Sequence, residues 1–448
     1  MCIHSINTLA TDRARQASGC PGGFDSPAPH PYYLLLSMKS PLHPVRAFIA
    51  RFGSMHVILP VSVLNSAGYT IIALGLIFYL RDRFGASAAT VGLASALYNG
   101  LYFAGCFAWR PLGLRLLPRY SLIISSFTTV VLMVLLVMAN RIAVVLALYA
   151  AIGFSVALFW PSIMGWLSAG LDGTGLSRRI SYFNLAWSAG VIVGPLIAGV
   201  LAERRLEWPL IVGTVLVAAV GCIVTAASLF LSGVRTDMHR DRRKSSADGP
   251  DESSPLRFPS WIGLVPAYAV LGALLVVVPL HTRDSLGLTE SAVGSVLLLR
   301  GLTASLGFWA FGRWSGWHFR IGPVVGALAL LVPLVLLLRA GALASYLVAL
   351  PLIGLTVSAT YTFSVFHGVA GSSDRTRRMA VHEALLTVGI VIGALGAGRL
   401  YETGGASAAY LGSVATLLLG LFLQLAYLVA SRGLARRARS SSAGQAAV

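Results

Sequence analysis

A few charged side chains interrupt long apolar segments of this sequence, and two of them are the residues best placed to do chemistry. Glu383 follows His382 in the stretch "RRMAVHEALLTVGIVIGALGAGRLYE", residues 377–402, and Arg300 lies within the apolar run 291–312. A carboxyl group and an imidazole can take up and release protons, whereas a guanidinium group binds carboxylate or phosphate. The sequence therefore places proton-exchanging groups and an anion-binding group where charge is costly.

The common enzyme motifs do not occur. "HEALL" would need a second histidine at Leu386 to bind zinc as HExxH, and the chain has no Gly-x-Ser-x-Gly or Gly-Lys-Ser phosphate-binding sequence. Cys2 and Cys20 lie near the N-terminus and Cys106 and Cys222 lie in apolar runs, with no metal-binding spacing. We therefore expect no catalytic residues, no metal, no cofactor and no disulfide.

The elements that must position these residues are membrane-spanning helices. The chain is 56% hydrophobic and only 11% charged, which leaves too few charged groups to cover a soluble protein of 448 residues. Apolar runs of about 20 residues, the length that crosses a bilayer, lack the alternation of barrel strands. The predicted helices are 56–80, 88–110, 120–140, 142–168, 180–203, 208–232, 261–281, 291–312, 320–339, 342–369, 379–401 and 407–431.

The distribution of positive charge predicts the orientation. The net charge of +18 could suggest a nucleic-acid partner, but most of the 34 Lys and Arg fall in the termini and in the loops on one side of the helices. An excess of Lys and Arg marks the cytoplasmic side of a membrane protein. We expect an integral, multi-pass protein of the plasma (inner) membrane with both termini in the cytoplasm, and no nucleic-acid binding.

Composition divides the chain into five parts. Residues 1–50 form a tail that we expect to be disordered and cytoplasmic, and translation could begin at Met38. The polar stretch from 233 to 260 is expected to be a cytoplasmic linker. The remaining parts are two sets of six helices, 51–232 and 261–432, and a cytoplasmic tail, 433–448.

The two sets of helices are internal repeats. Residues 178–203 match 377–402 at a shift of 199, which aligns Gly190 with Gly389 and Gly194 with Gly393. Other helices align at shifts of 201 and 202, and Trp160 falls on Tyr361. We expect parallel repeats related by an axis along the membrane normal, with Gly190 and Gly389 each facing the opposite half.

Here the chain resembles the major facilitator superfamily, over about residues 50 to 432. The stretch "GVIVGPLIAG", Gly190 to Gly199, is similar to a Gly-Pro motif that this family carries on its fifth helix, often in proton-driven exporters. In "GCFAWRPLGLR", Gly105 and Arg110 match the family's loop between helices 2 and 3, but Trp109 stands where that loop has an acidic residue. The resemblance implies an all-α membrane protein with twelve transmembrane helices in two pseudo-symmetric six-helix bundles.

The resemblance also implies where a site would lie. In this family, helices 1, 4, 7 and 10 line a central cavity, and helices 2, 5, 8 and 11 join the two halves. The substrate-binding candidates are Arg300, Asn65, Tyr69, Trp160, Tyr268, Tyr361 and His367. The helix-packing and gating candidates are Gly190, Gly194, Pro195, Gly199, Gly389, Gly393, Gly105 and Arg110. Packing alone is the competing interpretation, because small residues and aromatic residues also fill helix interfaces.

Glu383 and His382 are the candidates for proton coupling. At 1.5 Å per residue, Arg300 lies about 18 Å deep and Glu383 about 7 Å, so a direct ion pair is not expected. Desolvation favours the protonated carboxyl, which would let Glu383 load and release a proton. A structural ion pair with Arg377, Arg378 or an arginine of the loop between helices 2 and 3 is the equal alternative.

The hypotheses for function follow from these charges. We expect a secondary transporter that moves a small organic molecule across the lipid bilayer by alternating access, as a monomer, and exports it in exchange for protons. Proton-coupled uptake of an anionic metabolite bound by Arg300 is the second hypothesis. A receptor or assembly protein that has a transporter fold but does not transport is the third.

Overall fold

The computed structural model describes residues 54–109, 111, 116–168, 173–230, 254–314, 316, 322–339, 342–370 and 375–445. The expectations for residues 1–50, for Met38, for Arg110 and for most of the linker lie outside this part of the chain.

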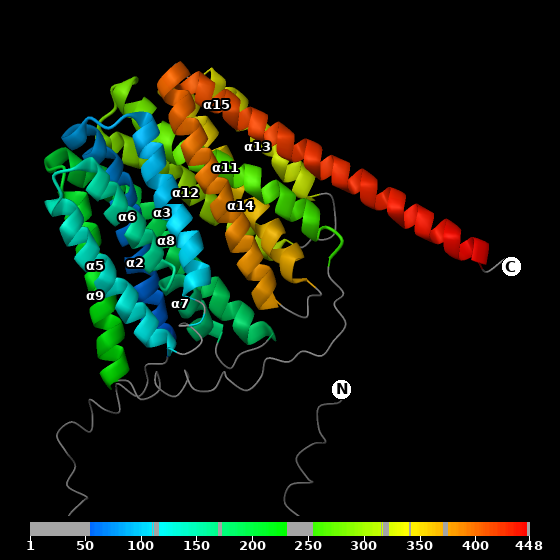
Figure 1. Cartoon of the computed structure of the whole chain (residues 1–448), viewed down its shortest axis with the longest axis horizontal. Coiled ribbons are helices and arrows are strands. Elements are labelled where there is room, and N and C mark those ends of the chain that lie inside the picture. Colours follow the sequence, from blue (N-terminus) through cyan, green and yellow to red (C-terminus); the bar gives the residue numbers. More distant parts are fainter. Residues whose placement is uncertain are drawn as a thin grey trace, which may run out of the picture. The chain divides into compact units, whose positions relative to one another are not determined.

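Every element assigned in the described residues is a helix, as expected. In chain order these are α2 (Met55–Phe84), α3 (Ala88–Ala108), α5 (Pro118–Met138), α6 (Ile142–Val156), α7 (Phe159–Ser168), α8 (Gly173–Arg204), α9 (Trp208–Phe230), α11 (Arg257–Asp284), α12 (Glu290–Arg313), α13 (Gly322–Leu338), α14 (Leu343–Val369) and α15 (Arg375–Gln445) (Figure 1).

Ten helical segments among the described residues are long and apolar enough to cross a membrane. The segment Ile142–Leu167 combines α6 and α7, and Val324–Leu338 of α13 is apolar but shorter than the rest. The segment Arg378–Ser431 contains a break, since Gly404 and Gly405 of α15 have non-helical backbone angles. This break falls between the two predicted helices 379–401 and 407–431.

Some helices extend beyond their predicted bounds. α8 begins at Gly173 instead of residue 180, α11 begins at Arg257 instead of residue 261, and α15 continues to Gln445. Hydropathy detects only the apolar part of a helix, whereas backbone hydrogen bonding continues through the polar residues at its ends.

The turns after α2 and α11 are built in the same way. Gly85 and Gly287 have φ angles of 60° and 67°, a left-handed conformation that glycine adopts without steric cost. Two residues later, the side chains of Ser87 and Thr289 accept a hydrogen bond from the backbone N–H at the start of α3 and α12. Each turn therefore ends one long helix and starts the next.

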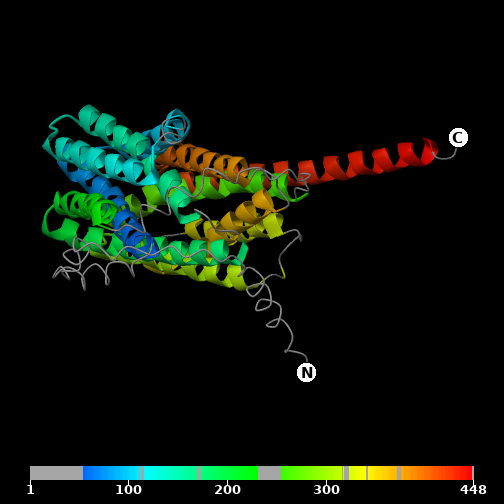
Figure 2. The same ribbon diagram turned by 90° about the horizontal axis from the view of Figure 1, so that it is seen from below.

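Helix pairs in the two halves correspond to one another. α2 packs on α8 in the first half, and α11 packs on α15 in the second. Between the halves, α3 packs on α15 and α12 packs on α8; the pair α3 and α15 lies side by side in both views (Figures 1 and 2). The paired helices occupy equivalent positions in the sequence repeat.

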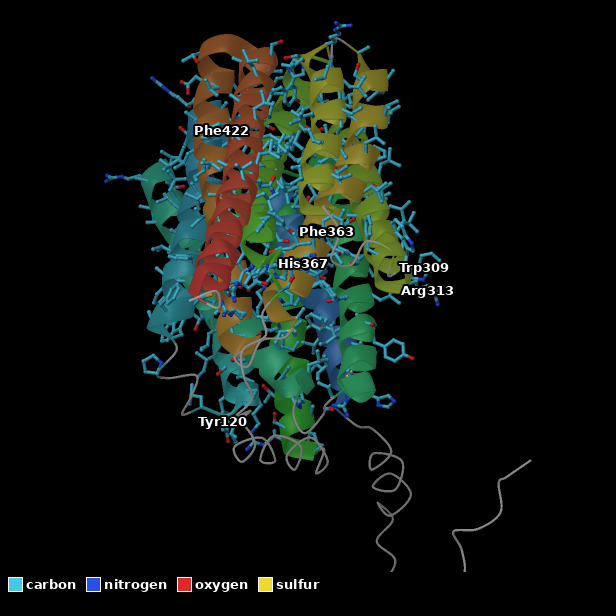
Figure 3. The ribbon with its side chains drawn as sticks, turned by 90° about the vertical axis from the view of Figure 1, so that its right-hand side faces the viewer. Tyr120, Trp309, Arg313, Phe363, His367 and Phe422 are labelled. Atoms are coloured by element: carbon cyan, nitrogen blue, oxygen red, sulfur yellow. The ribbon has the colours of Figure 1, made fainter. Side chains whose placement is uncertain are left out.

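The packed core and the apolar surface are both extensive. One core cluster joins α2 to α11, with Ile71 and Phe78 beside Leu274 and Val278. Large apolar side chains also cover the outside of the helices; Phe422 on α15 is 66% exposed (Figure 3). Exposed apolar surface on this scale suits a bilayer and not water.

Candidate functional site

Glu383 lies on α15, is half-buried, and interacts electrostatically with tyrosines from both halves of the chain. Its carboxylate interacts electrostatically with Tyr102 of α3, Tyr268 of α11 and Tyr361 of α14. We call these three residues the tyrosine cluster. Tyr102 also hydrogen-bonds with Cys106, one turn further along α3. Tyr102 was not among the sequence candidates, because a tyrosine in an apolar helix has no pattern that distinguishes it from packing.

No cation of the described side chains lies within ion-pair distance of Glu383. Arg378 instead places its guanidinium over the ring of Trp261, with 5.8 Å between the guanidinium carbon and the ring centroid. The side chains of Arg377 and of Arg110 lie outside the described residues. Arg378 therefore forms no ion pair with Glu383 in this structure, and pairing with Arg377 or with an arginine of the loop between helices 2 and 3 stays a prediction.

His382 is fully buried beside Glu383 and points to a different neighbour. Its Nδ1 atom lies 2.8 Å from the hydroxyl oxygen of Ser364 on α14. Its ring meets the ring of Tyr361 edge to face, with centroids 4.8 Å apart. The Nε2 atom of His382 has no hydrogen-bond partner among the described groups. His382 thus joins α15 to α14 and leaves one ring nitrogen available inside the protein.

Arg300 reaches the same region from α12. It interacts electrostatically with Tyr268, and its buried Nε atom has no hydrogen-bond partner in the described part of the chain. The backbone of Arg300 packs against Gly354 of α14, where a Cβ would lie 2.3 Å from the Arg300 carbonyl oxygen. No ion pair joins the described side chains of Arg300 and Glu383. Tyr268 therefore interacts with both charges.

The first-half candidates form a separate group. Tyr69 of α2 hydrogen-bonds with Thr129 of α5 at 3.2 Å. Asn65 lies one turn before Tyr69, is fully buried, and has no hydrogen-bond partner for either amide atom among the described residues. Trp160 meets the ring of Phe183 edge to face at 6.3 Å. Tyr69 and Trp160 pack against the same core cluster, and none of these side chains carries a charge.

His367 is separate from both groups. It lies six residues beyond Tyr361 on α14, which is about 9 Å along a helix. Its Nδ1 atom lies 2.9 Å from the Ser254 hydroxyl, and the side chain is fully buried (Figure 3). This contact ties α14 to the chain just before α11.

The glycine contacts correct one prediction. Gly190 packs against Ser66 and Ala67 of α2, and Gly389 packs against Tyr268 and Ala269 of α11. Each therefore faces the first helix of its own half, and the expectation that both face the opposite half was wrong. A small-residue groove shows that a helix approaches closely, but it does not say which helix. Gly194 and Gly393 follow the same pattern, on α2 and α11.

Other glycines of α3, α8 and α12 make the contacts between the halves. A Cβ at Gly92 would lie 2.3 Å from the carbonyl oxygen of Ala394, and a Cβ at Gly294 would lie 2.3 Å from that of Pro195. A Cβ at Gly199 would likewise lie 2.1 Å from the carbonyl oxygen of Glu290. Pro195 and Ala394 are equivalent positions of the repeat, so the two contacts correspond. Gly105 instead packs within its own half, against Phe154 of α6 and Ala157, the residue that follows α6.

Charged residues that sequence reasoning missed join the halves where α2 is followed by α3 and α11 by α12. Arg81 contacts Asp284 across the halves, and Arg283 binds both carboxylate oxygens of Asp82, at 2.8 and 2.7 Å. The signal was present in the sequence, since "RDRFGAS" from Arg81 and "RDSLGLT" from Arg283 align at the shift of 202.

The comparisons with known proteins identify the family. The sequence model of the Major Facilitator Superfamily matches residues 58–369, which is more than half of the chain. The chain belongs to the major facilitator superfamily. It is therefore an integral, multi-pass membrane protein of a transporter family, as the resemblance of its motifs predicted.

Individual relatives are distant. An uncharacterised MFS-type transporter of Mycobacterium tuberculosis is 25% identical over 351 residues, which are 72% of this chain and 80% of that protein. A bacterial homologue of the human lysosomal transporter Spinster, in an inward-facing and unoccupied conformation, superposes with a TM-score of 0.63 at 14% identity, covering 87% of this chain and 97% of that one. A peptide transporter, POT, gives a TM-score of 0.68 at 11% identity, covering 87% and 98%. These likenesses show the transporter fold.

Proposed function

We propose that this protein exports a small organic molecule in exchange for protons, by alternating access. Glu383 loads and releases the proton, and the substrate binds among the tyrosine cluster, Arg300 and the first-half group of Asn65, Tyr69 and Trp160. The lipid bilayer is its environment, and the working unit is a monomer.

The proposed architecture is two pseudo-symmetric bundles of six helices, residues 51–232 and 261–432, joined by a cytoplasmic linker. The corresponding helix pairs and the break in α15 at Gly404 and Gly405 support it. The positive charge of the termini and linker supports a cytoplasmic position for both ends. On this topology, Gly85 and Gly287 lie at the outer surface of the plasma membrane.

One observation carries the proposal of proton coupling. Glu383 is a half-buried carboxylate in a helix of the membrane, and it has no cation within ion-pair distance among the described side chains. It interacts electrostatically with phenol groups from both halves. An ionised carboxylate is costly there, so a change in its access to water changes its proton affinity. If the halves move, the environment of Glu383 changes because Tyr102 belongs to one half and Tyr361 to the other.

Export is supported by the Gly-Pro sequence of α8, which resembles that of proton-driven exporters. The Arg300 guanidinium supports a second candidate, uptake of an anionic metabolite, because its Nε atom has no partner among the described groups. Both candidates use the same proton-coupling residue. They differ in the direction of flux and in the charge of the substrate.

The test begins with purified protein in liposomes that contain a pH-sensitive dye. Compounds are screened for those that move protons, and outward exchange, inward symport or no flux separates the exporter, the importer and the non-transporting receptor. With a substrate in hand, Glu383→Gln should retain counterflow of labelled substrate but lose accumulation driven by a pH gradient, because glutamine binds without titrating.

The matched control is Glu207→Gln, which removes a half-exposed carboxylate 3.8 Å from Arg83. It should leave both modes of transport unchanged. Normal pH-driven accumulation by Glu383→Gln would remove Glu383 from the coupling mechanism. Loss of both modes together with a lower melting temperature would instead indicate a structural role.

A further inference from the structure

An open cavity of about 420 Å³ lies at one end of the second half, where α11 and α13 end and α15 breaks at Gly404 and Gly405. On the proposed orientation this is the outer end of the protein, the end that carries Gly287. All residues that line the cavity belong to the second half. One of them, His281, lies 13 residues beyond Tyr268 on α11, which is about 20 Å along a helix. The cavity is therefore separate from the candidate site.

The equivalent place in the first half, where α2 ends and α8 is followed by α9, is filled by side chains. The guanidinium of Arg83 lies over the ring of Tyr79, 5.3 Å from the centroid. It donates a hydrogen bond of 3.1 Å to the side-chain oxygen of Asn140 and lies 3.8 Å from the Glu207 carboxylate. An arginine and a glutamate thus occupy the space between the helix ends of the first half.

Smaller residues stand at the same positions in the second half. The shift of 202 aligns Arg83 with Ser285. The shift of 199, continued past α8, aligns Glu207 with Ala406. Gly405 lies beside Ala406 in the lining, and a Cβ added to Gly405 would meet nothing within 4 Å. The loss of the arginine and of the carboxylate therefore leaves open space where the first half is packed.

The polar groups that line this space suit an anion. Arg339, which follows α13, stands where the shift of 201 places Met138, so the second half has gained a cation. The Arg339 side chain is exposed and forms no ion pair with another described residue. His281, Ser285 and Ser407 add an imidazole and two hydroxyl groups, and none of the described lining residues is acidic. A guanidinium beside several hydrogen-bonding groups is typical of a phosphate or carboxylate site.

The remaining features indicate an organic anion instead of an inorganic one. The volume lies in the range of small-molecule sites, and three leucines, Leu286, Leu337 and Leu338, line part of the cavity. His281 is held from behind, because its ring lies 6.2 Å from that of Tyr346 and 6.0 Å from that of Tyr401. The Tyr346 hydroxyl in turn lies 2.9 Å from that of Tyr410, and both tyrosines are fully buried. The imidazole is therefore positioned before any ligand binds.

We propose that this cavity is a second binding site and that it takes the phosphate group of an organic phosphate ester. Arg339 supplies the charge, the imidazole and the two hydroxyl groups supply hydrogen bonds, and the leucines contact the carbon atoms next to the phosphate. Two sources present this chemistry at the outer end: the head group of a phospholipid of the outer leaflet, and a soluble organic phosphate. Only the choice of leaflet rests on the proposed orientation. The site itself depends neither on proton coupling nor on the transported substrate.

The test measures binding to the purified full-length protein in detergent, where no transport takes place. Dihexanoyl phosphatidylglycerol and glycerol phosphate are the two phosphate probes, and dihexanoylglycerol, which lacks the phosphate, is the negative control. At least one phosphate probe should bind and raise the melting temperature, and dihexanoylglycerol should not. A Kd for the lipid that is at least about tenfold lower than that for glycerol phosphate would assign the site to a phospholipid, and the reverse order to a soluble ligand. Binding of neither phosphate probe would overturn the proposal.

Two variants locate the site. Arg339→Gln removes the charge, and the Kd of the bound probe should rise by about tenfold. The double variant Ser285→Arg with Ala406→Glu introduces the pair that fills the first half, and it should abolish binding without lowering the melting temperature of the unliganded protein. Arg141→Gln is the matched control, because Arg141 is an exposed arginine at the same end of the first half. It should leave the Kd unchanged.

An Arg339→Gln variant that binds as tightly as the starting protein would overturn the proposal, even if the double variant does not fold. Equal loss of binding in Arg141→Gln and Arg339→Gln would also overturn it, because the probe would then be reading positive charge in general. A failed binding test leaves proton-coupled export in place, since the transport assay of Glu383→Gln does not use this cavity. Conversely, loss of the coupling proposal would leave the phosphate site in place.

Discussion

The charges at the outer end and the charges inside the membrane are arranged in opposite ways. Arg81, Asp82, Arg283 and Asp284 lie in water-accessible positions, and each has a partner across the halves. Glu383 and Arg300 are half-buried, yet neither forms an ion pair with a described residue. The exposed charges are thus paired, although an exposed ion pair contributes little to stability. The charges inside the membrane have no described ion-pair partner, although an unpaired charge there lowers stability the most.

The difference indicates what each set does. Paired, exposed charges can separate and be solvated, so they suit a contact that opens and closes. A buried charge without a partner is retained at a cost in stability, and the usual reason is that a ligand or a proton supplies the missing partner. On the proposed function, the comparison separates residues that would set the conformation from residues that would bind a substrate or a proton.

The largest effect is expected from the backbone contact that lies beside the outer charges. Gly294→Ala would place a Cβ 2.3 Å from the Pro195 carbonyl oxygen, so α12 and α8 could no longer approach as they do. The outer end should open. Pulsed electron paramagnetic resonance between spin labels on Arg141→Cys and Arg339→Cys, two exposed positions in different halves, should show at least about a tenfold rise in the long-distance population. The four native cysteines are replaced by serine for this measurement. Gly312→Ala on the same helix is the control, because a Cβ there meets nothing within 4 Å. Equal populations in the two variants would show that outer closure does not need this contact.

A smaller effect is expected from the guanidinium inside the membrane. If Arg300 binds an anionic substrate, Arg300→Lys should raise KM by about fivefold with little change in expression, since an ammonium cannot make two parallel hydrogen bonds to a carboxylate. Initial rates of uptake or counterflow measure this. Transport of an anion at the normal KM by Arg300→Ala would eliminate the uptake hypothesis and leave export of an uncharged molecule in place.

The smallest effect is expected from a polar group that already has a partner. Tyr69→Phe removes the phenol that hydrogen-bonds with Thr129, and the thermal midpoint in detergent should fall by about 2–4 °C. Thr129→Val should have a similar effect, and the double variant should cost less than the sum of the two. Additive losses would indicate that the two side chains do not stabilise each other.

Much of the fold could be predicted from the sequence, because hydropathy reports membrane-spanning helices directly. Within the site, Glu383 and Arg300 were identifiable because a charge in an apolar segment is exceptional. The exchanged Arg–Asp pairs were missed because charges at the ends of helices are ordinary, although their alignment in the repeat marked them. The partners of Gly190 and Gly389 were assigned to the wrong half, since spacing along one helix does not reveal which neighbour fills its groove.

The two regions must also be coupled if the account is correct. An ionised Glu383 favours a state in which water reaches it, and a protonated Glu383 tolerates a state in which the cavity is closed to the cytoplasm. Lower pH should therefore raise the population in which the outer end is open. The change should be reversible and should not require substrate.

The most direct test measures the Arg141–Arg339 spin-label distances as a function of pH, in the starting protein and in Glu383→Gln. We expect the long-distance population of the starting protein to rise as pH falls. Glu383→Gln should show the acid-like distribution at every pH, because glutamine mimics the protonated carboxyl. A pH response that persists unchanged in Glu383→Gln would contradict the claim that this carboxylate couples proton binding to the movement of the halves.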